Sequence, residues 1–124
     1  MKVKKIHNHG NHLIFDAHSN ATLNDKKFIE KFLLELTKKI KMKNISKPLV
    51  IQYKAKEKSE SGVTGTIILA ESSIQIHTYP NKKWLALDIF SCKEFEKEKT
   101  IKYLLKKLQI INYKTKFIKR GFLQ

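Results

Sequence analysis

Three short apolar alternations follow one another closely in the middle of the chain, and they constrain the fold more than any other feature. Residues 64–70, 73–79 and 84–90 each carry apolar side chains at every second position, which is typical of strands with one buried face. The links between them are too short for the crossover of about a dozen residues that parallel strands need. The sequence therefore predicts antiparallel hairpins, with Pro80-Asn81 marking the second turn.

The flanking segments supply more strands and two helices. Residues 12–18, 49–54 and 111–119 are predicted strands, and residues 56–62 are a polar loop. A first amphipathic helix is expected from an N-cap at Asn24 to about Lys43, because apolar side chains recur there at helical spacing. A second helix carries an apolar face made of Ile101, Leu104, Leu105 and Leu108.

The order of these elements predicts the fold class. One strand, a helix, four strands, a helix and a final strand indicate an α+β fold: a two-layer sandwich with an antiparallel sheet and both helices on one face. The strands carry more apolar surface than two helices need for their packing, which predicts a dimer. The residues counted are Ile67, Leu69, Ile74, Ile76, Leu85, Leu87 and Ile89.

Length and cysteine content limit the class of protein. With 124 residues, 41% of them hydrophobic, residues 1–124 are expected to form one domain. No run approaches the roughly 20 apolar residues of a membrane span, and Met1–Lys5 does not lead into a signal-peptide core, so we expect a cytoplasmic protein. The single cysteine, Cys92, excludes an internal disulfide and a Cys-rich metal site, and no metal is expected.

The charge leaves one alternative open. Lys and Arg number 26 against 11 acidic residues, giving a net charge of +15 that attracts polyanions nonspecifically. Because lysines occur in every segment, a solvated basic surface explains them, and no specific nucleic-acid or membrane partner is expected. A basic RNA-binding α+β module is the alternative, supported by Tyr113, Phe117, Lys119 and Arg120 but lacking the aromatic signature of an RRM.

The run ESSIQIHT, residues 71–78, combines a serine and a histidine in an unusual place. In a straight strand Ser72 and His77 would lie about 16 Å apart on opposite faces. His77 can then act on Ser72 only if the chain bends sharply, or if the two residues belong to different copies of the chain.

Residues 61–92 carry a longer pattern, SGVTGTIILAESSIQIHTYPNKKWLALDIFSC. This block resembles the small prokaryotic S-adenosylmethionine decarboxylases, a family of self-processing, pyruvoyl-dependent enzymes. The family pattern is Gly-Val-Ser-Gly, Glu-Ser, Ile-His-Thr-Trp-Pro-Glu, Ala-x-Asp and Thr-Cys-Gly. The matching residues are 62–65, 71–72, 76–81, 86–88 and 91–92, with family spacing from Thr64 through Ser72 and His77 to Cys92, and His12-Leu13 resembles the family's start.

The resemblance implies a chemical role for the Glu71-Ser72 link. Ser72 would attack the carbonyl of Glu71, and elimination would release residues 1–71 (the β chain) from residues 72–124 (the α chain), whose Ser72 becomes a pyruvoyl group. The family gives His77 the role of proton acceptor in this processing, and Thr64 that of a supporting hydroxyl. A strained turn at the link would help. Thr64 replaces the usual serine, and its stiffer side chain predicts slower processing.

The resemblance also implies how the mature enzyme works. The pyruvoyl group would bind the substrate amine as a Schiff base and accept electrons as CO2 leaves, and Cys92 would return a proton as the thiol, the form that predominates at neutral pH. In the family, two protomers share each site, so Ser72 and Cys92 would face Thr64 and His77 of a homodimer partner. The decarboxylated product would supply the aminopropyl group for spermidine in polyamine biosynthesis.

Two departures leave the substrate open. The family's glutamate for the ribose hydroxyls is Asn81 here, and its adenine-stacking aromatic is Lys58, for which Tyr53 or Tyr79 could substitute. S-adenosylmethionine is the expected substrate, and ornithine or arginine is the alternative within the same chemistry. A relative that no longer processes itself and has a binding role is a further alternative, because Thr64 is unusual.

Overall fold

The fold is an antiparallel sheet with one face covered by two helices. The computed structural model describes residues 10–121, with η1 and η2 as single turns of 3-10 helix, and the opening segment Met1–Lys5 lies outside that range. The elements are β1 (Gly10–Ser19), α1 (Lys26–Lys39), β2 (Leu49–Tyr53), η1 (Lys58–Glu60), β3 (Gly62–Leu69), β4 (Ser72–Tyr79), η2 (Pro80–Lys82), β5 (Trp84–Ser91), α2 (Lys97–Lys107) and β6 (Ile110–Arg120).

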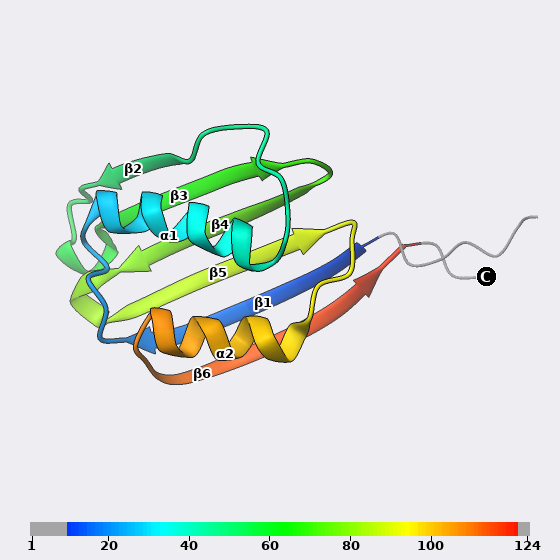
Figure 1. Ribbon diagram of the computed structural model, residues 1–124. Helices are drawn as coiled ribbons and strands as arrows, with labels where there is room; N and C mark the ends of the chain where they lie inside the picture. The colour runs from blue at the N-terminus through cyan, green and yellow to red at the C-terminus, as the bar shows by residue number, and fades with distance from the viewer. Residues whose placement is uncertain (1–9, 122–124) are drawn as a thin grey trace, which may run out of the picture.

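The strands are arranged in the order β2-β3-β4-β5-β1-β6, and every neighbouring pair is antiparallel. Both helices lie on the same side of this sheet (Figure 1). The predicted fold class and the predicted order of elements are therefore confirmed.

The N-cap of helix α1 lies one residue later than predicted. The cap is Asp25, whose carboxylate accepts hydrogen bonds from the backbone N–H groups of Lys27 (3.0 Å) and Phe28 (3.2 Å). The prediction of Asn24 as N-cap is wrong, because the Asn24 side chain instead accepts a hydrogen bond of 2.6 Å from Gln52 at the end of β2.

The same helix also ends earlier than predicted. Its last helical residue is Lys39, and the following Ile40 serves as C-cap. Lys41 has a φ of 58°, in the left-handed region that a continuing α-helix cannot include, so the predicted extension to about Lys43 is wrong.

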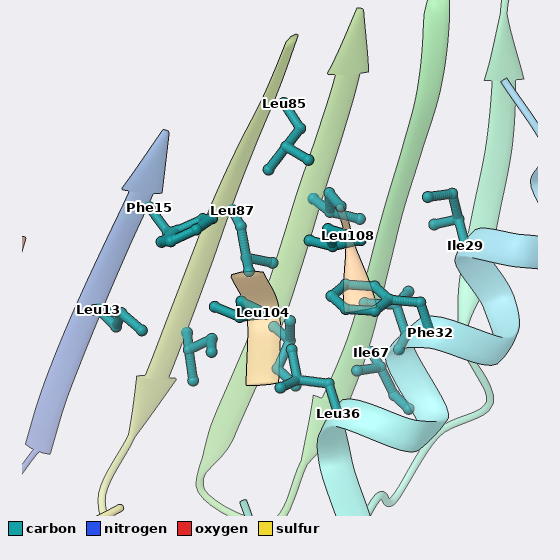
Figure 2. Close-up of a cluster of buried hydrophobic side chains, with 14 of the residues drawn as sticks. Leu13, Phe15, Ile29, Phe32, Leu36, Ile67, Leu85, Leu87, Leu104 and Leu108 are labelled. Atoms are coloured by element: carbon teal, nitrogen blue, oxygen red, sulfur yellow. The ribbon is translucent and has the colours of Figure 1, made fainter. Parts of the chain in front are cut away.

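The hydrophobic core lies between the sheet and the helices. Side chains from the strands and from α1 and α2 meet there, as Figure 2 shows for Phe15, Phe32, Ile67 and Leu104. The seven strand residues counted above as an apolar surplus are all 0–1% exposed in this core. The reasoning that they would need a partner chain is therefore wrong, because the two helices already cover them.

The other face of the sheet carries no helix (Figure 1). Large apolar side chains are exposed there near one edge of the sheet, at alternating positions of β2 and on β3: Leu49, Ile51, Tyr53 and Ile68. We call this side of the sheet the open face. Within residues 10–121, neither helix is long and apolar enough to cross a membrane.

Candidate active site

A two-residue hairpin link holds the Glu71-Ser72 pair. Leu69 at the end of β3 pairs with Ser72 at the start of β4, so that Ala70 and Glu71 form the turn. Glu71 has a φ of 64°, in the left-handed region that costs a non-glycine residue about 1 kcal/mol or more. The strained backbone lies directly before Ser72, where a strained turn would help the predicted self-cleavage.

Ser72 and Cys92 lie together at this end of the sheet. Ser72 is 8% exposed and pairs with Ser91, the last residue of β5. The backbone N–H of Cys92 donates a hydrogen bond of 3.3 Å to the Ser72 hydroxyl oxygen. The turn after β3 and the end of β5 are accordingly neighbours in Figure 1. The serine hydroxyl thus has a fixed backbone donor.

Ser91 fixes the turn that carries Cys92. Its buried hydroxyl donates a hydrogen bond to the Lys93 carbonyl (2.7 Å) and accepts one from the Lys93 N–H (3.0 Å). These two bonds span Cys92, whose side chain is exposed. No separate role was predicted for Ser91, and its role as an anchor follows from this geometry.

Thr64 and His77 form a second pair at the opposite end of β3 and β4. They lie directly opposite each other across the two strands, and Thr64 Oγ1 is 3.1 Å from His77 Nδ1, within hydrogen-bond distance. Thr64 is exposed and His77 is partly exposed on the open face. A threonine at this position therefore keeps its hydroxyl on the histidine ring.

A close backbone approach holds this second pair in register. A Cβ atom at Gly62 would lie 1.8 Å from the Thr78 carbonyl oxygen, so only glycine fits at the start of β3. The buried Thr78 hydroxyl accepts a hydrogen bond from Val63 N–H (2.9 Å) and donates one to the Leu23 carbonyl (2.8 Å). The strand ends on both sides of Thr64 and His77 are thereby fixed.

The two pairs do not meet within one chain. Strand β4 pairs with β3 and β5 without a register shift, so the five residue-to-residue steps from Ser72 to His77 span about 16 Å. Ser72 is in phase with the core residues Ile74 and Ile76, whereas His77 alternates onto the open face. A sharp bend that would bring His77 to Ser72 is absent from the described strand.

A hollow of about 300 Å³ lies beside the Thr64–His77 pair. Its lining comes from the end of β2, from η1 and from the facing ends of β3 and β4: Tyr53, Glu60, Gly62, Thr64, His77, Thr78 and Tyr79. Of the two predicted substrate-binding residues, Tyr79 lines this hollow. Asn81 lines a neighbouring hollow together with Lys58, and Tyr53 borders both.

Glu60 is the residue of this hollow that sequence reasoning missed. It lies in the polar loop that was predicted for residues 56–62, where a short 3-10 turn, η1, places it at the hollow. Glu57 in the same loop has the same side chain and does not line the hollow. No periodicity or motif separates the two glutamates, so only the folded loop identifies Glu60.

Shifted pKa values occur in the helix layer. The Lys107 ammonium, 2.7 Å from the Glu35 carboxylate, hydrogen-bonds it and lowers the pKa of Glu35. Burial, with a contribution from the Glu35 charge, raises the pKa of Tyr103 to about 12.

Among residues 10–121, no group of three or more His, Cys, Asp or Glu side chains is arranged to hold a metal ion.

Comparison with known proteins identifies the family and a solved structure of similar fold. Residues 11–121 match the family described as S-adenosylmethionine decarboxylase. In solved structures, the fold is similar to the crystal structure of the adenosylmethionine decarboxylase from Aquifex aeolicus. The TM-score is 0.78 at 22% sequence identity, over 93% of this chain and 92% of that one.

Curated relatives include archaeal proteins named S-adenosylmethionine decarboxylase proenzyme. The protein of Methanococcus maripaludis strain C5 is 33% identical over 118 residues, which cover 93% of this chain and 92% of the relative. That of Thermococcus gammatolerans is 42% identical over 64 residues, which cover 51% of this chain and 45% of the relative, or about half of its length. The family match and the Methanococcus relative establish that this chain belongs to the S-adenosylmethionine decarboxylase family.

Proposed function

We propose that this chain cleaves itself between Glu71 and Ser72 and then decarboxylates S-adenosylmethionine with the pyruvoyl group made from Ser72. The observation that carries the proposal is the hairpin. A left-handed Glu71 directly precedes a serine whose hydroxyl is held by the Cys92 N–H. A strained link beside a fixed hydroxyl favours attack of that hydroxyl on the preceding carbonyl.

The proposed cleavage balances without an external oxidant. Ser72 Oγ attacks the Glu71 carbonyl carbon, the peptide C–N bond breaks, and an ester replaces the amide. Loss of the Ser72 α-proton then expels the Glu71 carboxylate from Cβ. Addition of water to the resulting enamine, in its imine form, releases ammonia and leaves a ketone at the new N-terminus. The hydroxyl proton and the α-proton each need an acceptor, and a histidine near neutrality is suited to this role.

His77 is the proposed acceptor, supplied by a second copy of the chain. The separation of about 16 Å along β4 supports this assignment, because His77 of the same copy is too far from Ser72. The uncovered sheet face gives a second copy a surface to bind, and its exposed apolar residues Leu49, Ile51 and Ile68 favour association. Each homodimer site would then combine Ser72 and Cys92 of one copy with Thr64 and His77 of the other.

The residues around Ser72 suit a group of this kind. The backbone N–H of Cys92 donates to Ser72 Oγ, the oxygen that leaves with the Glu71 carboxylate, so after cleavage this N–H can donate to the new N-terminal group. Ser72 is buried, which suits a group made from the residue itself rather than a large separate cofactor. When present, the pyruvoyl group supplies an electron sink for the loss of CO2. Cys92 is proposed to donate the proton that replaces the carboxylate, since it is a free, exposed cysteine whose backbone N–H contacts Ser72.

Decarboxylation assays with several substrates test the proposal. Purified protein is incubated with carboxyl-labelled S-adenosylmethionine, ornithine or arginine, and released CO2 is counted. We expect release from S-adenosylmethionine alone, and none in Ser72→Ala with any substrate. Release from ornithine or arginine would move the chain to the alternative substrate, and no release from any of the three would contradict the proposed activity. The product would feed aminopropyl transfer in spermidine synthesis, in the cytoplasm.

A further inference from the structure

We propose that the hollow beside Thr64 and His77 holds the nucleoside part of the substrate, with Glu60 binding the sugar hydroxyls and Tyr53 contacting the base. The inference rests on the proposed function, because it assigns a part of S-adenosylmethionine to a place on this chain. It gives Glu60 a role that the family pattern does not, and it chooses Tyr53 over Tyr79 as the residue that contacts the base.

The position of the hollow matches the shape of the substrate. Thr64 and His77 line it from β3 and β4, and Glu60 lines it from η1, which directly precedes β3. From Thr64 to Gly62 alone the strand rises about 7 Å. In S-adenosylmethionine the sugar is separated from the reacting carbon by two methylenes, the sulfur and one further methylene. A reacting carbon near His77 therefore places the sugar several ångströms away, toward η1.

Glu60 has the chemistry to bind a vicinal diol. It is the single carboxylate among the described residues that line the hollow, and its side chain is 55% exposed. Two carboxylate oxygens accept hydrogen bonds from two adjacent hydroxyls, and such charge-assisted bonds are stronger than neutral ones. Lys82 Nζ lies 3.3 Å from Glu60 Oε1, but both side chains are half exposed and a surface pair of this kind contributes little.

Two tyrosines line the hollow, and Tyr53 is the one whose ring makes no aromatic or cation–π contact within residues 10–121. The other, Tyr79, packs against Trp84 at a centroid distance of 4.9 Å and has Lys82 Nζ 5.8 Å from its ring centroid. Tyr53 is 57% exposed and takes part in none of the aromatic or cation–π contacts found within residues 10–121. Its ring can therefore stack on a purine base.

The arrangement explains how the site can lack a carboxylate at position 81. Asn81 belongs to η2 and lines the neighbouring hollow, whereas η1 packs against η2 and brings Glu60 to the hollow of His77. A negative charge is thus present at this end of the sheet, on a different loop from the one that the sequence pattern indicated.

Binding of two nucleosides without an amino-acid group tests the inference independently of turnover. Calorimetry on the processed protein compares 5′-methylthioadenosine with its 2′,3′-dideoxy counterpart. We expect wild type to bind the diol about tenfold more tightly, and Glu60→Gln to reduce this preference to about twofold. Glu57→Gln, in the same loop and outside the hollow, is the matched control and keeps the wild-type preference. Tyr53→Leu is expected to weaken both nucleosides equally, by about fivefold.

The outcomes separate this inference from the proposed function. A denaturing gel establishes that each variant is cleaved, and CO2 release by wild type establishes the activity. If wild type decarboxylates S-adenosylmethionine but binds both nucleosides alike, or if Glu60→Gln keeps the tenfold preference, the assignment of Glu60 is overturned. If Tyr53→Leu leaves the affinities for both nucleosides unchanged, the assignment of Tyr53 to the base is overturned. If wild type is neither cleaved nor active, the proposed function fails first and the nucleoside assignment fails with it.

Discussion

The two ends of β4 hold their functional side chains by different physical means. At the Ser72 end, a left-handed residue and a backbone hydrogen bond fix a buried hydroxyl against the end of β5. At the His77 end, two side chains on an unstrained cross-strand pair contact each other on the open face. The first end is suited to reacting with its own backbone, and the second to exchanging a proton with a group brought to it.

Under the proposed function, this contrast means that one chain carries two incomplete halves of a site. The halves lie about 16 Å apart along β4 and on opposite faces of the sheet. Moving either half within its own fold would break the register of β4 with both neighbours. In the proposed homodimer, a second copy would complete the site without any such change.

Mixing two inactive variants tests whether the two ends of β4 act together across two copies of the chain, and it has the largest expected effect. His77→Ala alone should slow self-cleavage by on the order of 100-fold, because the proton acceptor is lost. Ser72→Ala alone cannot be cleaved. Co-expressed with different tags, they should restore cleavage of the His77→Ala chain, whose Ser72 then meets His77 of the other copy. Intact mass of each tagged chain is the measurement, and failure to restore cleavage would contradict the shared site.

Removing the thiol separates the two chemical steps at the Ser72 end. Cys92→Ala should leave self-cleavage intact, since the hydrogen bond to Ser72 comes from the Cys92 backbone N–H, and should lower turnover by on the order of 100-fold. A gel reports cleavage, and CO2 release reports turnover. Wild-type turnover in Cys92→Ala would remove the thiol from the mechanism.

Changing Thr64 tests whether its methyl group influences self-cleavage, and the expected effect is smaller. Thr64→Ser keeps the hydroxyl at His77 and removes a methyl group that restricts the side chain, so self-cleavage should become about two- to fivefold faster. The control is Thr66→Ser. Thr66 lies two residues further along β3 on the same face, and its hydroxyl donates a hydrogen bond to the Ile74 carbonyl instead of contacting His77. Equal cleavage rates for wild type and Thr64→Ser would indicate that the methyl group has no influence.

A change in the helix layer should affect stability and leave both ends of β4 untouched. The Tyr103 hydroxyl oxygen is buried without a hydrogen-bond partner among the described residues, and its pKa is raised from 10.0 to about 12. The folded protein thus favours the neutral phenol. Its contribution to the free energy of unfolding is present below pH 10 and decreases as the pH rises toward 12.

Tyr103→Phe should remove that alkaline loss and raise stability at neutral pH by about 1 kcal/mol, because no hydrogen bond is broken. Urea unfolding at pH 7 and pH 11 measures both effects, with Tyr113→Phe, a tyrosine that stacks on Phe15, as the control. An alkaline loss in Tyr103→Phe equal to that of wild type would contradict this account of Tyr103.

The order of elements was predictable because short links between alternating segments allow few topologies. The ends of the helices were less predictable. Asn24 and Asp25 are both good caps, and the contact of Asn24 with Gln52 decides between them. Side-chain alternation also could not tell how much apolar surface two helices cover, which is why the predicted surplus was wrong. In the site, residues within a fixed motif were identifiable, whereas Glu60 depends on how a polar loop folds against η2.

The mass of the purified wild-type protein under denaturing conditions tests the central claim most directly. Self-cleavage predicts two chains, residues 1–71 and residues 72–124, the second lighter than its sequence by the conversion of an N-terminal serine to a pyruvoyl group. The Ser72→Ala variant predicts a single chain at the full mass. A wild-type protein that is folded and dimeric, yet has a single uncleaved chain with an unmodified Ser72, would contradict the account.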